Sequence, residues 1–180
     1  MHFQQTSIKG LIEVTPRIFF DERGFFFETY QQQLFANSGI PENFVQDNRS
    51  FSKKGVIRGL HFQKEPYAQG KLVQVIKGKV LDVVIDLRAG SPTLGHYAKF
   101  ILDGEKGNML YVPEGFAHGF AALQDTFLMY KCTNFYNKAS ESGICWNDPQ
   151  LNIDWSITDP IVSEKDQILP SFEEAMNILL

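Results

Sequence analysis

The chain has 180 residues, of which 43% are hydrophobic, and a formal net charge of −4, which suits one globular domain with a sizeable core and argues against a general nucleic-acid-binding protein. No apolar run approaches the roughly 20 residues of a membrane-spanning helix, and the N-terminus lacks the basic and apolar segments of a secretory signal. The two cysteines, Cys132 and Cys145, cannot make a disulfide framework, so we expect the protein in the reducing cytoplasm. The sequence has no internal repeat, low-complexity tract or linker, so we expect a single domain over residues 1–180.

The first predicted elements are a short helix and a hairpin. Residues Gln31–Asn37 have a weak helical pattern that Gly39-Ile40-Pro41 would end. Hydrophobic residues then alternate along Lys71–Lys77, and a second apolar run follows over Lys79–Arg88, with Gly78 between the two. Two strand-like runs separated by a turn residue predict a β-hairpin.

The second half of the chain continues with short strands and ends in a helix. The predicted strands occupy Tyr97–Leu102, Met109–Val112, Phe116–Leu123 and Phe127–Phe135. Residues Ser171–Leu180 are predicted as a helix because Ser171 suits an N-cap and two glutamates follow in the first turn. Short strands at intervals of roughly 8–12 residues favour a mainly β sandwich or barrel.

Two histidine-containing stretches have the spacing of the two cupin motifs. In "GNMLYVPEGFAH", five residues separate Gly107 from Pro113-Glu114-Gly115, and two more precede His118. In "GVIRGLH", five residues separate Gly55 from His61. This resemblance implies a cupin jelly-roll barrel with short peripheral helices, the C-terminal helix among them.

The cupin motifs depart from the metal-binding pattern at two positions. Gln63 stands where metal-binding cupins carry a second histidine, and Lys71 stands where they carry a glutamate. A lysine cation repels a divalent metal, and glutamine is a poor ligand. We therefore expect no metal, and a site in the barrel whose chemistry is proton transfer.

Nine landmarks in order make the resemblance closer than the cupin motifs alone. The resemblance extends from about Ile12 to Pro170, and its landmarks read "FFDERGFFFETY", "FVQDN", "VIRGLHFQ", "AQGKLVQVIKG", "DVVIDLRAGSPTLG", "VPEGFAHGF", "YKCTNFY", "ESGICWNDP" and "SEKD". On these residues the chain resembles the dTDP-4-dehydrorhamnose 3,5-epimerase family. The resemblance implies a homodimer that exchanges an N-terminal strand, a dTDP-4-keto-6-deoxyhexose substrate, and epimerisation at C3 and C5 without a cofactor, nucleic acid or membrane.

The resemblance assigns four residues to catalysis. His61 would be the base, Asp166 its carboxylate partner, Lys71 the stabiliser of the enolate, and Tyr130 the acid on the opposite face of the sugar. The residue types suit these roles. C3 and C5 both neighbour the C4 ketone, so an imidazole can remove their acidified protons, and a fixed cation beside O4 stabilises the negative charge that develops there.

Nine further residues match substrate-binding positions of the family. Guanidinium groups suit phosphate oxygens, which fits two arginines, and an aromatic ring can stack on thymine. By resemblance, Arg23 and Arg58 contact the diphosphate, Glu28, Gln46 and Asn48 contact the nucleotide, Tyr136 stacks on thymine, and His118, Glu141 and Lys165 contact the substrate elsewhere. Arg23 and Glu28 would act in the partner's site through the exchanged strand.

Three other readings stay open at this point. Close relatives epimerise C3 alone, and they share the histidine, the lysine and much of the pattern; Tyr130 favours the double epimerase without deciding between the two. A metal-dependent cupin such as a dioxygenase is disfavoured by Gln63 and Lys71. A sugar-nucleotide-binding module without catalysis is disfavoured because a binding protein has no need of a proton donor.

Overall fold

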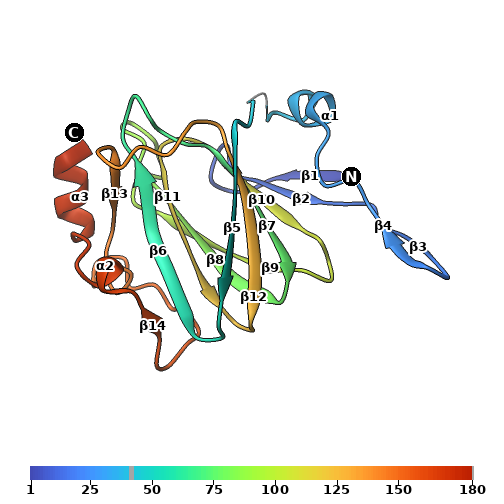
Figure 1. Cartoon of the computed structure of the whole chain (residues 1–180). Coiled ribbons are helices and arrows are strands. Elements are labelled where there is room, and N and C mark those ends of the chain that lie inside the picture. Colours follow the sequence, from blue (N-terminus) through green and yellow to red (C-terminus); the bar gives the residue numbers. More distant parts are fainter. Residues whose placement is uncertain (41–42, 180) are drawn as a thin grey trace.

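The structure is a computed structural model that describes residues 1–40 and 43–179, and most of its regular structure is β-strand. Two β-sheets face each other, as Figure 1 shows. The first sheet has the order β1-β2-β10-β7-β12-β5. Its strands are β1 (His2–Gln5), β2 (Ile12–Thr15), β5 (Gln46–Ser52), β7 (Lys71–Lys77), β10 (Met109–Val112) and β12 (Thr126–Cys132).

The second sheet has the order β13-β6-β11-β8-β9, and β14 pairs in parallel with β6. Three helices and a separate two-stranded hairpin, β3-β4, complete the elements of the described residues. The second sheet is built from β6 (Val56–Gln63), β8 (Lys79–Asp86), β9 (Tyr97–Asp103), β11 (Phe116–Ala122), β13 (Glu141–Gly143) and β14 (Ile161–Val162). The other elements are β3 (Phe19–Asp21), β4 (Gly24–Phe26), α1 (Gln32–Asn37), α2 (Glu164–Gln167) and α3 (Phe172–Leu179).

Strand β8 explains how one sheet contributes to two separate cores. Val80 and Val84 pack between the sheets, whereas Leu81 and Val83 belong to a cluster on the other face that includes Phe172 of α3. Successive side chains of a strand point to opposite faces, so a strand covered on both sides is apolar almost throughout. The predicted mainly β jelly-roll fold with short peripheral helices is confirmed.

The predicted hairpin of Lys71–Lys77 and Lys79–Arg88 is wrong. Strand β7 pairs with β10 and β12, whereas β8 pairs with β9 and β11, so the two strands lie in different sheets. The chain crosses from one sheet to the other at Gly78, whose φ is +91° and where a side chain would collide with the backbone of Asp125. Apolar alternation and a turn glycine are common to a hairpin and to such a crossing.

The two predicted helices are confirmed within the described residues. Gln31 caps α1, and its side chain accepts the Leu34 backbone N–H. In α3, the Ser171 hydroxyl accepts the Glu174 backbone N–H at 3.2 Å, and the Glu174 carboxylate accepts the Ser171 backbone N–H at 2.8 Å, which is a capping box. Pro41 and Leu180, which belong to the predicted helix stop and helix end, lie outside the described residues.

The β3-β4 hairpin projects from the body of the molecule beside β1 and β2 (Figure 1). Its phenylalanines are exposed, with 76% for Phe20 and 64% for Phe25. Exposed aromatic rings in such number on a small hairpin are typical of a surface that another protein covers. None of the helices in residues 1–40 and 43–179 is long and apolar enough to cross a membrane.

Candidate active site

A cleft of about 200 Å³ lies between the two sheets. It brings together five of the residues that the sequence singled out, and its walls come from five strands of both sheets. The lining residues are Ser50, Arg58, His61, Lys71, His118, Gly119, Phe120, Leu128 and Tyr130. The candidate base, the candidate acid and the lysine therefore share one cavity.

A bulge in β6 turns two of these residues toward the cleft. His61 pairs with His118 on β11 and Arg58 pairs with Phe120, so three residue steps on β6 match two on β11. Side chains three positions apart on a regular strand face opposite ways, and the extra residue brings Arg58 and His61 to one face. At the bulge Gly59 has φ +125°, and a side chain there would collide with the backbone of β11.

His61 and Asp166 form a pair, as the family resemblance implied. The His61 Nε2 atom lies 2.7 Å from the Asp166 Oδ1 atom, and Asp166 is 4% exposed. Ser163 caps the short helix α2 and accepts the Asp166 backbone N–H at 3.1 Å, while the bulge residue Gly59 donates its N–H to Asp166 Oδ2 at 3.2 Å. With Nε2 held by the carboxylate, Nδ1 is the ring nitrogen left to accept a proton.

The ionisation of Asp166 is consistent with this pairing. Burial by itself raises the pKa of Asp166, but the hydrogen bond and charge of His61, the Gly59 N–H and the charge of Lys165 together lower that pKa below its usual value. Asp166 is therefore a carboxylate at neutral pH. Such a group stabilises the imidazolium that forms when His61 takes a proton.

Lys71 and Tyr130 face His61 from the other sheet. The Lys71 Nζ atom lies 5.9 Å from the centre of the Tyr130 ring. Burial lowers the pKa of Lys71, and electrostatic interactions with Cys132, Asp82 and Glu141 oppose that shift. Burial, with smaller contributions from Cys132 and Glu141, raises the pKa of Tyr130, which keeps the phenol protonated and able to donate.

His118 has a carboxylate partner that the sequence did not predict. Its Nε2 atom lies 2.8 Å from the Asp82 Oδ2 atom, and Asp82 is 0% exposed. The signal for this pair was present in "KVLDVVID", where one aspartate interrupts a strand of apolar residues. A carboxylate in such a strand is buried only where it has a partner.

Three residues predicted to contact the substrate form a cluster near the cleft. The Tyr136 hydroxyl donates to Glu141 Oε2 at 2.8 Å, and Lys165 Nζ donates to Glu141 Oε1 at 2.6 Å. Burial raises the pKa of Glu141, but these two hydrogen bonds, together with the charges of Lys165 and His61, lower that pKa below its usual value. The charge of Glu141 also acts on Lys71 and on Tyr130, so this cluster is electrostatically part of the site.

Two residues of β5 connect this cluster to the cleft. The Tyr136 backbone N–H donates to Gln46 Oε1 at 3.0 Å, Gln46 Nε2 donates to Asn48 Oδ1 at 3.0 Å, and Asn48 Nδ2 donates to Cys132 Sγ at 3.4 Å. Cys132 lies opposite Lys71 in the β12-β7 pair. Gln46 and Asn48 therefore lie between the loop of Tyr136 and the lysine.

The two arginines differ in their positions. Arg58 lines the cleft, and its guanidinium donates to Ser52 Oγ at 2.9 Å and to the Phe51 carbonyl at 3.0 Å, which fixes it at the edge of the cavity. Arg23 lies in the turn of the projecting hairpin, where it pairs with Asp21, and Glu28 follows the hairpin as an exposed residue. The structure does not bring Arg23 or Glu28 to the cleft of their own chain.

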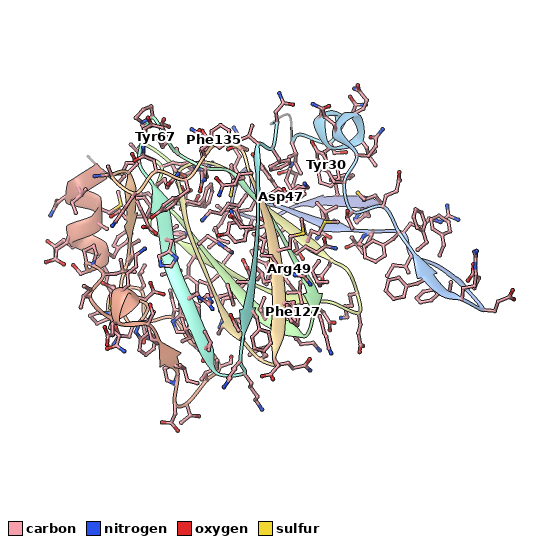
Figure 2. The ribbon with its side chains drawn as sticks, viewed as in Figure 1. Tyr30, Asp47, Arg49, Tyr67, Phe127 and Phe135 are labelled. Carbon is pink, nitrogen blue, oxygen red and sulfur yellow. The ribbon has the colours of Figure 1, made fainter. Side chains whose placement is uncertain are left out.

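Gln63, which stands where metal-binding cupins carry a second histidine, makes hydrogen bonds to loop residues. Its amide nitrogen donates to the carbonyl oxygens of Tyr67 at 2.6 Å and Phe135 at 3.2 Å, and its oxygen accepts the Asn137 N–H at 2.7 Å. Tyr67 and Phe135 lie close together at one end of the sheets (Figure 2). Gln63 thus ties two loops together. Among residues 1–40 and 43–179, no group of three or more His, Cys, Asp or Glu side chains could hold a metal ion.

Comparison with known proteins connects this geometry to a family. The sequence model described as dTDP-4-dehydrorhamnose 3,5-epimerase matches residues 5–174. The dTDP-4-dehydrorhamnose 3,5-epimerase of Shigella flexneri is 48% identical over 168 residues, which cover 92% of this chain and 93% of the relative. The chain belongs to the dTDP-4-dehydrorhamnose 3,5-epimerase family. It is an isomerase, as the sequence predicted.

Solved structures of similar proteins support this membership of the dTDP-4-dehydrorhamnose 3,5-epimerase family. The 3,5-epimerase of Legionella pneumophila, solved in complex with dTDP-4-keto-L-rhamnose, has a TM-score of 0.92 and 43% identity, and the match covers 99% of this chain and 94% of that one. A 3'-monoepimerase of Streptomyces bikiniensis, in complex with dTDP-quinovose, has a TM-score of 0.90 and 32% identity over 99% of this chain and 90% of that one. The same fold therefore carries both double and single epimerases.

Proposed function

We propose that this epimerase converts dTDP-4-dehydro-6-deoxy-D-glucose to dTDP-4-dehydro-L-rhamnose by inverting C3 and C5, without a cofactor. The observation that carries the proposal is the placement of the acid-base groups on opposite walls of one cleft. His61 is on β6 of one sheet, whereas Lys71 and Tyr130 are on β7 and β12 of the other. A sugar held between the sheets would have a base on one side and an acid on the other.

Each inversion begins with proton removal by His61. The Nδ1 atom takes the proton from the carbon next to the ketone, the electron pair of the C–H bond moves into the bond to C4, and the carbonyl oxygen becomes an enolate. The Asp166 carboxylate, 2.7 Å from Nε2, stabilises the imidazolium that results. Lys71 stabilises the enolate oxygen, an interaction stronger in the transition state than in the ground state.

Each inversion ends with proton donation from the opposite sheet. Tyr130 gives its phenolic proton to the carbon on the face away from His61, the enolate collapses to the ketone, and the phenolate regains a proton from solvent through the open side of the cleft. The His61 imidazolium releases the abstracted proton to solvent, which restores the base. C3 and C5 flank C4 on either side, so one base, one acid and one lysine serve both carbons in turn.

The test is proton NMR of dTDP-4-keto-6-deoxyglucose with the purified protein in heavy water. Because each inversion exchanges a carbon-bound hydrogen for solvent deuterium, we expect deuterium at both C3 and C5. Deuterium at C3 alone would assign the chain to the single epimerases, of which the Streptomyces bikiniensis protein is a structural relative. Absence of exchange at both carbons, with tight binding of the nucleotide sugar, would mean that the protein is a sugar-nucleotide-binding module without catalytic activity.

We further propose that the active form is a cytoplasmic homodimer in which the β3-β4 hairpin of one protomer completes the site of its partner. Three observations support this assembly. The hairpin projects from its own chain (Figure 1), its phenylalanines are exposed, and the predicted diphosphate ligand Arg23 is absent from the cleft lining of its own protomer. Burial of the exposed rings against a second copy would stabilise the pair.

A hybrid dimer distinguishes this assembly from a site made by one chain. The two protomers carry different tags and different substitutions, His61→Ala in one and Arg23→Ala in the other. If Arg23 serves the partner, one site of the hybrid has both an intact His61 and an intact Arg23, and we expect about half of the wild-type activity per dimer. A purified hybrid no more active than either parental homodimer would contradict the exchange of this residue between protomers.

A further inference from the structure

Two histidine–aspartate pairs lie side by side in the site. His61 on β6 and His118 on β11 are directly opposite each other in the sheet, and both line the cleft. Each uses Nε2 toward a carboxylate, with 2.7 Å to Asp166 and 2.8 Å to Asp82. In both rings Nδ1 is therefore the nitrogen available to a ligand.

Asp82 is unusual among the carboxylates of the chain. It is 0% exposed and stands in a strand whose other side chains are mostly apolar, and its Oδ1 atom has no hydrogen-bond partner among the described residues. A buried carboxylate with one unpaired oxygen costs folding free energy, and an apolar residue would fill the position at no such cost. Packing alone therefore does not account for an aspartate at this position, whereas the groups around it can.

The groups around Asp82 belong to the cleft. His118 of β11 holds its Oδ2 atom, and the charge of Asp82 acts on Lys71 of β7, where it raises the lysine pKa against the effect of burial. The other titratable groups that act on Lys71 are Cys132 of β12 and Glu141 of β13. Of these three, Asp82 alone is also hydrogen-bonded to a residue of the cleft lining.

We propose that Asp82 is a positioning residue of the epimerase: as a buried carboxylate hydrogen-bonded to His118, it fixes this ring with Nδ1 turned toward the bound sugar. The proposal rests on the role given above to Lys71. Asp82 does not belong to the residues that line the cleft. It acts because a negative charge behind the cleft favours the protonated lysine that the enolate needs, while the same carboxylate stops the His118 ring from turning.

The first test is the pH dependence of deuterium exchange in Asp82→Asn, a substitution of nearly equal size. Removal of the negative charge takes away an interaction that raises the Lys71 pKa, so the lysine loses its proton at lower pH. We expect the alkaline limb of the exchange rate to move to lower pH, with a loss of about 10- to 100-fold near neutrality. Affinity for dTDP alone, measured by calorimetry, is expected to stay unchanged.

Asp86→Asn is the matched control, because Asp86 is a second 0%-exposed carboxylate of β8. It holds Arg88, Ser91 and Thr93 away from the cleft. We expect this variant to lose thermal stability and to keep the wild-type pH profile. An Asp82→Asn variant with an unchanged rate, or with an unmoved alkaline limb, would overturn the proposal.

A second measurement needs no variant. Nitrogen NMR of the imidazole rings in the wild-type protein reports which nitrogen of His118 carries the hydrogen, and we expect Nε2 to be protonated across the stable pH range. A neutral ring protonated at Nδ1 alone would overturn the proposed positioning. This readout is independent of turnover: if the wild-type protein exchanges no deuterium, the proposed reaction fails, while the nitrogen spectrum still tests the pairing of Asp82.

Discussion

Replacement of His61 by alanine is expected to reduce deuterium exchange at both C3 and C5 by about 10²- to 10⁴-fold, the usual contribution of a general base. The other imidazole of the cleft lining, His118, has a buried side chain with 8% exposure, against 30% for the side chain of His61, so we expect His61 and not His118 to reach the carbon-bound hydrogens. Loss at both carbons together is the decisive feature, because one base is proposed to serve both. Exchange is measured by proton NMR in heavy water.

The control for this substitution is His96→Ala, since His96 is exposed and lies outside the cleft lining. It should retain wild-type exchange. Circular dichroism and thermal unfolding should show both variants folded, because His61 is partly exposed and its removal leaves no apolar cavity. If His61→Ala exchanged hydrogen at C3 or C5 at a near-normal rate, His61 would not be the base for that carbon.

Replacement of Tyr130 by phenylalanine is expected to separate exchange from inversion. His61 would still remove the proton and, after equilibration with solvent, return deuterium to the same face. Donation from the opposite face would be lost, and we expect product formation to fall by about 10²- to 10⁴-fold while deuterium still enters the substrate. Proton NMR gives both quantities from one sample, because the epimerised product and the deuterated substrate have distinct signals.

Tyr67→Phe is the matched control, because Tyr67 is 39% exposed and lies away from the cleft lining at the end of the sheets (Figure 2). Both substitutions remove a hydroxyl and keep an aromatic ring, so a difference between them reports on the position of the hydroxyl. If Tyr130→Phe formed product at the wild-type rate, another group would have to donate the proton. Loss of exchange and of inversion together would mean that Tyr130 is needed before proton removal.

Much of the fold could be predicted from local patterns because the physics that decides it is local. Met109–Val112 was predicted with the bounds of β10, and Ser171 was predicted as the N-cap of the C-terminal helix. The hairpin predicted for Lys71–Lys77 and Lys79–Arg88 was wrong, because β7 and β8 lie in different sheets. Whether the chain stays in one sheet or crosses to the facing one depends on the long-range partners of the two strands, which are β10 and β12 for β7 and β9 and β11 for β8. Such pairing does not change the hydrophobic pattern of the strand itself.

The residues of the candidate site likewise divide into those that the local sequence could identify and those that it could not. His61, Lys71 and His118 could be found because motif spacing fixes them along the chain. Asp166 is 105 residues from His61, and only the resemblance indicated their contact. Asp82 was missed although its polar side chain in an apolar strand was visible, because a single buried aspartate identifies no partner until the neighbouring strand is known.

The proposed base and acid lie on opposite sheets, so the packing of the core between the sheets bears on the stereochemistry of the reaction. In the proposed mechanism, retention or inversion at each carbon depends on whether a proton arrives from Tyr130 of β12 before one returns from His61 of β6. Apolar side chains such as Leu128 and Val73 pack between the sheets that carry these two strands. The stereochemical outcome therefore depends on the packing of the barrel core as well as on the polar residues. A core variant that let the two sheets move relative to each other would release more unepimerised sugar, even with every polar group of the cleft unchanged.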